Sequence, residues 1–135
     1  MIKTFEQFNE LDPYGEEDWD DDNLTPVLII AKKQNKPYDQ ITGLDCSFNQ
    51  LSSLEGIENL VNLEKLWCYN NQLTSLEGIE NLVNLQVLSC SSNQLTSLEG
   101  IENLVNLKIL YCSSNQFSNK YKEYIRSLEI KDLRL

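Results

Sequence analysis

Apolar residues recur at fixed spacing through the middle of the chain, with polar residues between them. Ile41, Leu44 and Cys46 begin the pattern, and Asn49 and Leu51 complete it. This order, L-x-x-L-x-C-x-x-N-x-L, occurs four times, with Ile in the first slot of the first copy and Phe in the last slot of the last copy. The second Leu and the Cys lie two residues apart, which places both on one face of a strand and the residue between them on the other. The pattern therefore predicts four short, half-buried strands.

Three consecutive 22-residue blocks, at residues 51–72, 73–94 and 95–116, are nearly identical. The stretch LTSLEGIENLVN occurs unchanged at residues 73 and 95, and the copy at residue 51 differs only at Ser52. Since one short strand is not stable alone, we expect the blocks to stack at about 4.8 Å, each stabilised by its neighbours. The repeated Asn would then form a ladder at the turn after each strand, where its amide satisfies buried backbone groups of adjacent coils.

This pattern resembles the leucine-rich repeat. The 22-residue length and the continuation EGIENLVNL are similar to the internalin-like class, and the resemblance covers residues 41–117. It implies an α/β fold, a leucine-rich-repeat solenoid with a parallel β-sheet of about five short strands on the concave face. It also implies short turns or 3₁₀ segments on the convex side.

Residues 1–40 are expected to form an N-terminal cap. Thr25 and Pro26 have the residue types of a helix N-cap and of the first helical position. The apolar face of this helix is expected to cover the first strand. A shorter amphipathic helix is expected at residues 5–11, followed by an acidic loop at residues 16–22 without regular structure.

Residues 117–135 predict a helix and then a final strand. Apolar residues at helical spacing between residues 118 and 127 are followed by Ile130, Leu133 and Leu135, in the first, fourth and sixth slots of the repeat. An exposed terminal strand can pair with a second copy of the chain, so an edge-to-edge homodimer through this strand is one alternative. A monomer whose strand edge is solvated is the other.

The charge of the chain narrows the range of partners. Its 135 residues include 11 Lys and Arg, 21 Asp and Glu and no His, which gives a formal net charge of −10. This negative charge disfavours nucleic acid and anionic membrane surfaces as partners. Without His the chain lacks the usual general base and the commonest metal ligand. Residues 1–13 are acidic and contain no apolar leader segment, so we expect a soluble, cytoplasmic protein.

Two further features are possible metal sites. The four Cys lie 22 residues apart in one straight ladder, so Cys46 and Cys112 are expected roughly 14 Å apart, too far to share a zinc ion. We interpret the Cys as reduced, buried small hydrophobes. Asp18, Asp20 and Asp22 alternate like the start of a calcium loop but lack its Gly and Glu, so we expect a solvated loop, with weak divalent-cation binding as the alternative. No metal and no cofactor is expected.

The residues that differ between copies cluster on the predicted concave face. The fifth slot holds Trp67 and Tyr111 two strands, or about 10 Å, apart, with Ser89 between them. This arrangement predicts a shallow slot with aromatic walls, and exposed Trp and Tyr are enriched at binding hot spots. The alternative is that the rings only pack against each other or a nearby turn, and Phe48 is expected to pack under the N-terminal cap. The residues predicted to bind a partner are Asp45, Lys65, Trp67, Tyr69, Ser89, Ile109 and Tyr111.

These observations favour a non-enzymatic protein–protein interaction module, an adaptor or inhibitor that binds a protein partner on its concave face. No nucleophile–base pair supports an enzyme. One alternative is an acidic decoy, in which columns of Glu and the acidic residues 16–22 mimic nucleic-acid phosphates and occupy a basic protein. Another is a phage- or virion-associated structural protein, because residues 1–10, MIKTFEQFNE, faintly resemble leader peptides of small proteins packaged into tailed-phage heads.

Overall fold

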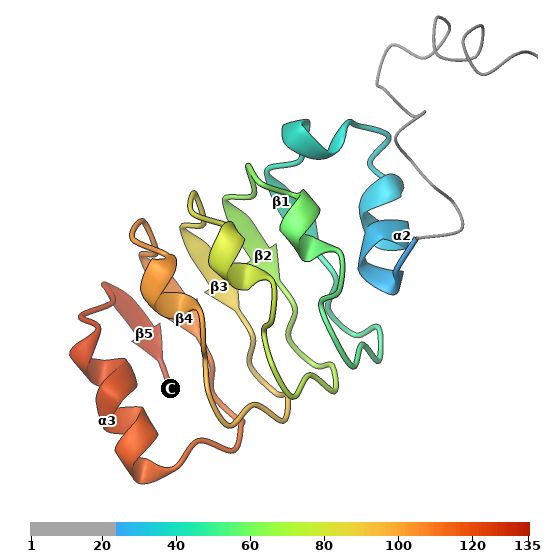
Figure 1. The fold of residues 1–135 in the computed structure, drawn as a ribbon. Coiled ribbons are helices and arrows are strands. Elements are labelled where there is room, and N and C mark those ends of the chain that lie inside the picture. The colour runs from blue at the N-terminus through green and yellow to red at the C-terminus, as the bar shows by residue number, and fades with distance from the viewer. Residues whose placement is uncertain (1–23) are drawn as a thin grey trace, which may run out of the picture.

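The computed structural model describes residues 24–135. The chain winds through successive coils, with a strand on one side of each coil and a short helix on the opposite side (Figure 1). Each coil contacts mainly the coil before it and the coil after it. The helix expected at residues 5–11 and the acidic loop at residues 16–22 lie outside the described residues.

One parallel sheet runs along the concave side, with its five strands in sequence order. The register places equivalent slots of the repeat opposite each other, so that Leu44 faces Leu66 and Leu110 faces Leu133. This sheet confirms the predicted leucine-rich-repeat solenoid. Its strands are β1 (Gly43–Asp45), β2 (Lys65–Trp67), β3 (Val87–Ser89), β4 (Ile109–Tyr111) and β5 (Asp132–Arg134).

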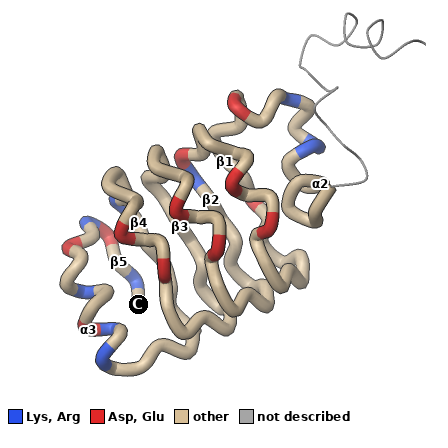
Figure 2. The backbone as a smooth tube through the Cα atoms, viewed as in Figure 1, with Lys and Arg blue, Asp and Glu red and all other residues tan. Residues whose placement is uncertain are grey.

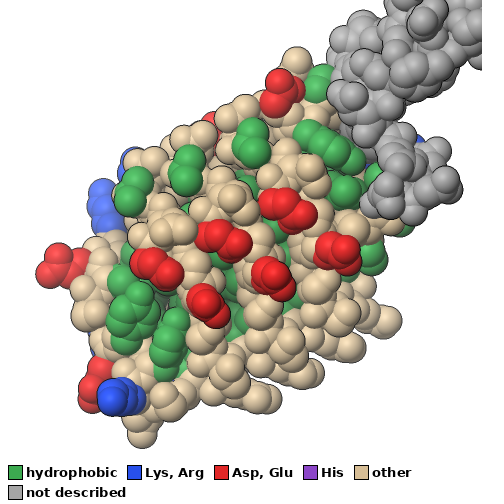
Figure 3. Space-filling view, viewed as in Figure 1, with side chains coloured by type: hydrophobic (Ala, Val, Ile, Leu, Met, Phe, Trp, Pro, Cys, Tyr) green, Lys and Arg blue, Asp and Glu red, His purple; other side chains and the backbone are tan. Residues whose placement is uncertain are grey.

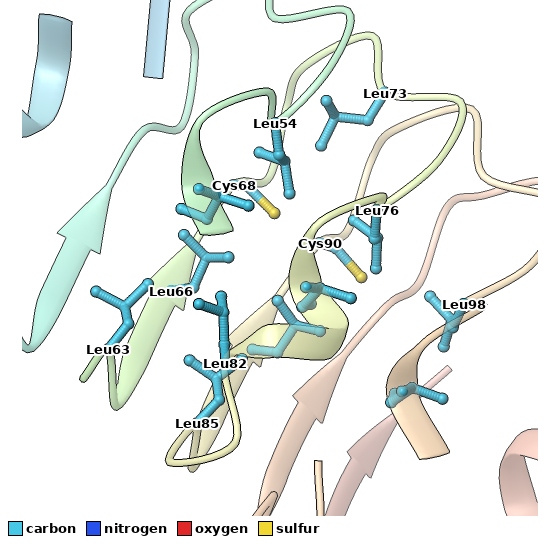
Figure 4. Packing of buried hydrophobic residues seen from close by; sticks show 14 of the residues in the cluster. Leu54, Leu63, Leu66, Cys68, Leu73, Leu76, Leu82, Leu85, Cys90 and Leu98 are labelled. Carbon is cyan, nitrogen blue, oxygen red and sulfur yellow. The ribbon is translucent and has the colours of Figure 1, made fainter. Parts of the chain in front are cut away.

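The apolar slots of the repeat form one continuous core. Leu66, Leu88 and Leu110, the middle residues of their strands, are 0% exposed. Leu and Cys side chains of successive coils fill the space between the sheet and the convex segments (Figure 4). Complete burial of one Leu contributes about 1.5–3 kcal/mol. Because each Leu contacts its copies in neighbouring coils, the coils stabilise one another rather than folding singly.

Three 3₁₀ helices line the convex side, as the resemblance implies. They are η4 (Ile57–Asn59), η5 (Ile79–Asn81) and η6 (Ile101–Asn103). A glycine with a φ near +100° precedes each of them, and at Gly78 this angle is 101°. A Cβ on Gly78 would lie 2.9 Å from Ile57 Cγ2 of the previous coil, so both the backbone angle and the close packing require glycine here.

A ladder of asparagines joins the coils at the turn after each strand. Asn93 accepts the N–H of Leu73 at 3.0 Å and donates to the carbonyls of Cys68 and Cys90 at 3.1 and 3.0 Å. Asn71 and Asn115 make the equivalent bonds. Each amide thus satisfies backbone groups of its own coil and of the coil before it, which confirms the predicted ladder for these three residues.

Asn49 does not take part in the ladder, and here the expectation is wrong. Its amide donates only to the carbonyl of Ser47, at 2.8 Å, and its side chain is exposed. The physical reason is positional. Each ladder Asn serves the coil that precedes it, whereas Asn49 follows the first strand of the sheet.

Residues 24–40, the described part of the N-terminal cap, contain helix α2 (Pro26–Lys32) and the 3₁₀ helix η3 (Tyr38–Gln40). Thr25 is the N-cap and accepts the N–H of Leu28 at 3.3 Å, and Pro is the first helical residue, as predicted. The Thr25 hydroxyl also donates to the carbonyl of Glu55. The second of these bonds fastens the start of α2 to the convex segment of the first coil.

The C-terminal end contains the predicted helix and strand. Helix α3 (Asn119–Ser127) begins after Ser118, whose hydroxyl accepts the N–H of Tyr121 at 3.1 Å, and it buries Ile125 against the core. Strand β5 then pairs in parallel with β4. None of the helices in residues 24–135 has the length and apolar character needed to cross a membrane.

Candidate functional site

Three rows of outward-facing side chains form the concave surface. The first row is the first residue of each strand, the second row is the third residue, and the third row lies two residues further along the chain. Between the first two rows the middle residue of each strand points into the core. The first row is Gly43, Lys65, Val87, Ile109 and Asp132, the second is Asp45, Trp67, Ser89, Tyr111 and Arg134, and the third is Ser47, Tyr69, Ser91 and Ser113.

The register brings the predicted site residues onto one surface. Trp67 lies opposite Ser89, and Ser89 lies opposite Tyr111, so the two aromatics share the second row as expected. Ser89 is only 5% exposed, whereas Trp67 and Tyr111 are half-buried. Ile109 is half-buried in the first row of β4. The structure thus contains the predicted row, and the part each residue plays in binding stays a prediction.

Tyr111 leans toward β5 and is partly covered by it. Its hydroxyl donates to Asp132 Oδ2 at 2.9 Å, and the Arg134 guanidinium carbon lies 4.2 Å from the ring centroid. The hydrogen bond to Asp132, with a smaller contribution from desolvation, raises the pKa of the Tyr111 hydroxyl. Sequence reasoning counted the positions of β5 and overlooked the contacts of its side chains with Tyr111.

Trp67 leans the other way, toward β1. Its Cζ3 lies 3.8 Å from the point that a Cβ on Gly43 would occupy. Beside this ring in the second row is Asp45, an exposed carboxylate whose Oδ1 accepts the N–H of Ser47 at 3.0 Å. Lys65 is exposed in the first row of β2. One indole face and one carboxylate therefore meet at the N-terminal end of the concave surface.

Phe48 is not packed under the cap, which corrects the expectation for this residue. Its side chain is 70% exposed, and its ring meets the Tyr69 ring edge-on, with centroids 5.4 Å apart at 84°. Helix α2 does not cover Phe48 because it packs across the N-terminal end of the stack (Figure 1), where Leu28 lies beside Gly56. Gln34, just after α2, donates to the carbonyl of Gly43 at the start of β1, whereas Phe48 lies beyond the other end of this strand. We call Phe48, Trp67 and Tyr69 the aromatic cluster.

A signal for Phe48 was present in the repeat. The equivalent positions in the next three coils hold Asn70, Ser92 and Ser114, and all four residues have φ between 53° and 58°. A left-handed backbone suits Asn and is unfavourable for a bulky side chain. A Phe at a position that otherwise holds small polar residues marks it as an exposed aromatic.

Acidic residues cluster on the opposite, convex side of the coils (Figure 2). They form two rows that run across the coils, beside a row of hydrophobic side chains (Figure 3). In one row the carboxylates have a structural role, because Glu80 Oε2 accepts the N–H of Gly78 at 3.0 Å and the neighbouring coils repeat this bond. Two shallow grooves of about 520 and 470 Å³ lie between the coils, and each is lined by four Glu.

The four cysteines are buried and free, as predicted. Burial raises the pKa of the Cys46 thiol to about 12 and that of Cys112 to about 11. Burial also raises the pKa of Cys68 and Cys90 well above the ordinary range. The thiols therefore stay protonated and act as apolar core groups. Within residues 24–135, no three His, Cys, Asp or Glu side chains come together as metal ligands would.

Comparison with known proteins finds leucine-rich repeats (2 copies) at residues 39–81 and 83–122. A leucine-rich-repeat protein of Leptospira interrogans is similar in structure, with a TM-score of 0.64 and 41% identity, over 70% of this chain and 25% of that protein. An internalin of Listeria monocytogenes has a TM-score of 0.65 and 33% identity, over 73% of this chain and 28% of its own. None of the curated proteins matches the sequence.

The chain thus spans about a quarter of the length of these two solved structures. Proteins with this architecture commonly mediate protein–protein interactions. The family match covers more than half of the sequence and agrees with the stacked coils, the parallel sheet and the asparagine ladder. The chain therefore belongs to the leucine-rich-repeat family.

Proposed function

We propose that this protein is a non-enzymatic adaptor or inhibitor that binds a protein partner on its concave face. The aromatic cluster at the N-terminal end of that face is the observation that carries the proposal. Trp67 is the last residue of β2, and Tyr69 follows it two residues later, about 7 Å further along an extended backbone. Phe48 contacts Tyr69 and extends the cluster to the rim. Clustered Trp and Tyr are enriched where interfaces concentrate their binding energy.

Phe48 supports this assignment because its position offers little to folding. A side chain that is 70% exposed contributes little hydrophobic stabilisation, and its φ of +58° is unfavourable for a bulky residue. The edge-on contact with Tyr69 is its aromatic contact. A partner that buried both rings would give Phe48 the apolar contacts that the folded chain does not provide.

The remaining residues of the surface supply selectivity. Asp45 and Lys65 are exposed charges of opposite sign on either side of the Trp67 ring, so they favour a partner with complementary charges at this spacing. Ser89 and Ile109 lie on β3 and β4, next to the aromatic cluster, and Tyr111 is the last of the proposed binding residues toward the C-terminus.

The test begins with affinity capture from the native host, using the full chain. A Trp67→Ala/Tyr69→Ala variant is compared with wild type and with a matched convex control, Val83→Ala/Val105→Ala, which also removes two exposed apolar side chains. The partner retained by wild type and by the control is identified, and its Kd for each protein is then measured by calorimetry.

We expect the concave variant to bind this partner at least about tenfold more weakly, since hot-spot truncations cost about 2 kcal/mol or more. The convex control should bind like wild type. Unchanged affinity of a folded concave variant would falsify the proposal, and loss of binding in the convex control would move the site to the other face.

The acidic decoy is a second candidate, favoured by the two convex grooves with four carboxylates each. A basic partner held there depends on charge, so its affinity should fall steeply with added salt. Binding through the aromatic cluster should change little. A Glu77→Gln/Glu99→Gln variant tests the same point, because these exposed side chains line the grooves and lie far from the sheet.

A further inference from the structure

The C-terminal end of the second row shows how this surface holds a cation. Tyr111 leans from β4 toward β5, so that its hydroxyl reaches Asp132 in the first row. Arg134, its partner in the second row, lies over the ring with the guanidinium carbon 4.2 Å from the centroid. At this distance a guanidinium is attracted to the electron-rich face of an aromatic ring. The arrangement consists of an aromatic ring, a cation over it and a carboxylate beside it.

Trp67 occupies the corresponding place at the N-terminal end, with a carboxylate in the second row where the other end has its cation. It occupies the second row of β2 and leans toward β1, where Gly43 in the first row leaves room for the ring. The second-row partner of Trp67 is Asp45, at the place that corresponds to Arg134. No Lys or Arg among residues 24–135 lies over the Trp67 ring.

Asp45 is also suited to a basic ligand. Its Oδ1 is fixed by the N–H of Ser47 at 3.0 Å, which orients the carboxylate and leaves Oδ2 for another donor. Within the described part of the chain, Asp45 and Lys65 form no ion pair with each other or with another residue. Within the described residues, the carboxylate therefore carries an unpaired negative charge beside the half-buried indole of Trp67.

We propose that Trp67 and Asp45 bind the guanidinium of an arginine side chain presented by the protein partner. The inference rests on the proposed function and names the chemistry of its central contact. A guanidinium is planar and weakly hydrated, so it can stack on the indole while its edge donates to the Asp45 carboxylate. A lysine ammonium fits less well, because it is strongly hydrated and cannot stack.

The test uses the full chain, labelled with ¹⁵N, and acetyl-arginine amide as the probe. The sequence contains two Trp, so a Trp19→Phe background leaves one indole N–H signal, that of Trp67. Acetyl-citrulline amide is the matched control, since it has the same shape and no charge. We expect a saturable shift of the indole and Tyr69 signals with the arginine probe at millimolar concentrations, and at least tenfold weaker binding of citrulline.

Variants of the charged residues make the test specific. Asp45→Asn should weaken binding of the arginine probe at least threefold. Lys65→Met should strengthen this binding, because a repelling charge is removed. Asp39→Asn, the control at an exposed Asp of η3, should leave the binding unchanged. The ¹⁵N spectrum shows whether each variant keeps its fold. Equal binding of citrulline, or no shift up to about 50 mM arginine probe, would overturn the arginine site. Neither result touches binding on the concave face as such, which the Trp67→Ala/Tyr69→Ala variant decides.

Discussion

The two ends of the second row differ in what lies beside an aromatic ring. At the C-terminal end Tyr111 is covered by Arg134 and bonded to Asp132, so part of its surface is satisfied within the chain. At the N-terminal end Trp67, which is also half-buried, has Gly43 and Asp45 beside it and no Lys or Arg of residues 24–135 over its ring. The same slot of the repeat therefore holds an aromatic with or without a cation over it, depending on the side chains of the neighbouring strand.

The largest expected effect is on stability and comes from the four buried thiols, which lie beneath the concave surface from Cys46 at its N-terminal end to Cys112 in the coil of β4. In the unfolded chain a thiol ionises near pH 8.5, whereas burial holds the pKa of Cys112 at about 11 and that of Cys46 at about 12. The stabilisation is complete below the unfolded pKa and is lost as the pH rises toward the native values. Between the unfolded and the native pKa, each buried thiol lowers the free energy of unfolding by about 1.4 kcal/mol per pH unit. The four thiols together therefore lower it by several kcal/mol near pH 10.

Urea unfolding between about pH 8 and pH 10 measures this loss. A Cys46→Ala/Cys112→Ala variant should show a shallower pH dependence, because two of the four titrating thiols are gone. In the native protein at neutral pH an alkylating reagent should modify none of the four thiols, since all are buried. A free energy of unfolding that is the same at both pH values would contradict the burial of protonated thiols.

The second effect compares the interior of the asparagine ladder with its N-terminal end. Asn93→Ala leaves buried backbone groups of two coils without partners, so it should cost about 2–3 kcal/mol. Asn49→Ala removes one exposed hydrogen bond and should cost under about 1 kcal/mol. Chemical denaturation of both variants tests the difference, and equal losses would show that the ladder does not depend on the preceding coil.

The third effect sharpens the comparison of the two aromatics in binding. Trp67→Ala should weaken the binding of the captured partner at least about tenfold, because an indole with no cation of residues 24–135 over it is removed from the proposed site. Tyr111→Ala should weaken partner binding only about twofold to threefold, because Arg134 and Asp132 already contact the Tyr111 side chain. Calorimetry on the two single variants gives the ratio. Equal losses would mean that the partner displaces Arg134 from Tyr111.

A smaller effect concerns stability at the C-terminal end. Tyr111→Phe removes the hydrogen bond to Asp132 and keeps the ring under Arg134, so we expect a small loss of stability. Arg134→Met retains most of the packing and removes the charge over the ring, with a similar loss expected. Thermal unfolding at neutral pH measures both, and no change in either variant would mean that β5 is held by its backbone bonds alone.

The smallest effect has the opposite sign. Phe48→Asn replaces an exposed ring with a residue that tolerates a left-handed backbone, so it should stabilise the chain by about 0.5 kcal/mol. The same change should weaken partner binding. If the variant is less stable than wild type and binds the partner with the same affinity, Phe48 contributes to the fold and not to partner binding.

The fold was predictable because the repeat assigns a physical task to each slot. The second Leu and the Cys must share a buried face, and Thr25 with Pro26 marks a helix start independently of the rest of the chain. These signals either recur in each repeat or lie within a few neighbouring residues. They can therefore be read without knowledge of the tertiary contacts. The strand order and the register follow from stacking identical coils.

The site was predictable only as far as its rows. The direction in which Trp67 and Tyr111 lean depends on Gly43 and on the side chains of β5, which do not repeat. These two contacts are single and tertiary, and periodicity carries no information about them. Phe48 was misplaced because α2 was expected to cover it, although the small polar residues at the equivalent positions of the other coils indicated an exposed side chain.

The near identity of the three blocks has a consequence for the size of the recognition surface. Each block presents the same Leu, Gly and Asn to the block before it and the block after it, so one more copy of residues 73–94 could be inserted without creating a new kind of contact. Every such insertion would move Trp67 and Tyr111 apart by about 4.8 Å. Duplication of a block would thus increase the distance between the two aromatics in uniform steps. The side chains around Trp67 and around Tyr111 would stay the same.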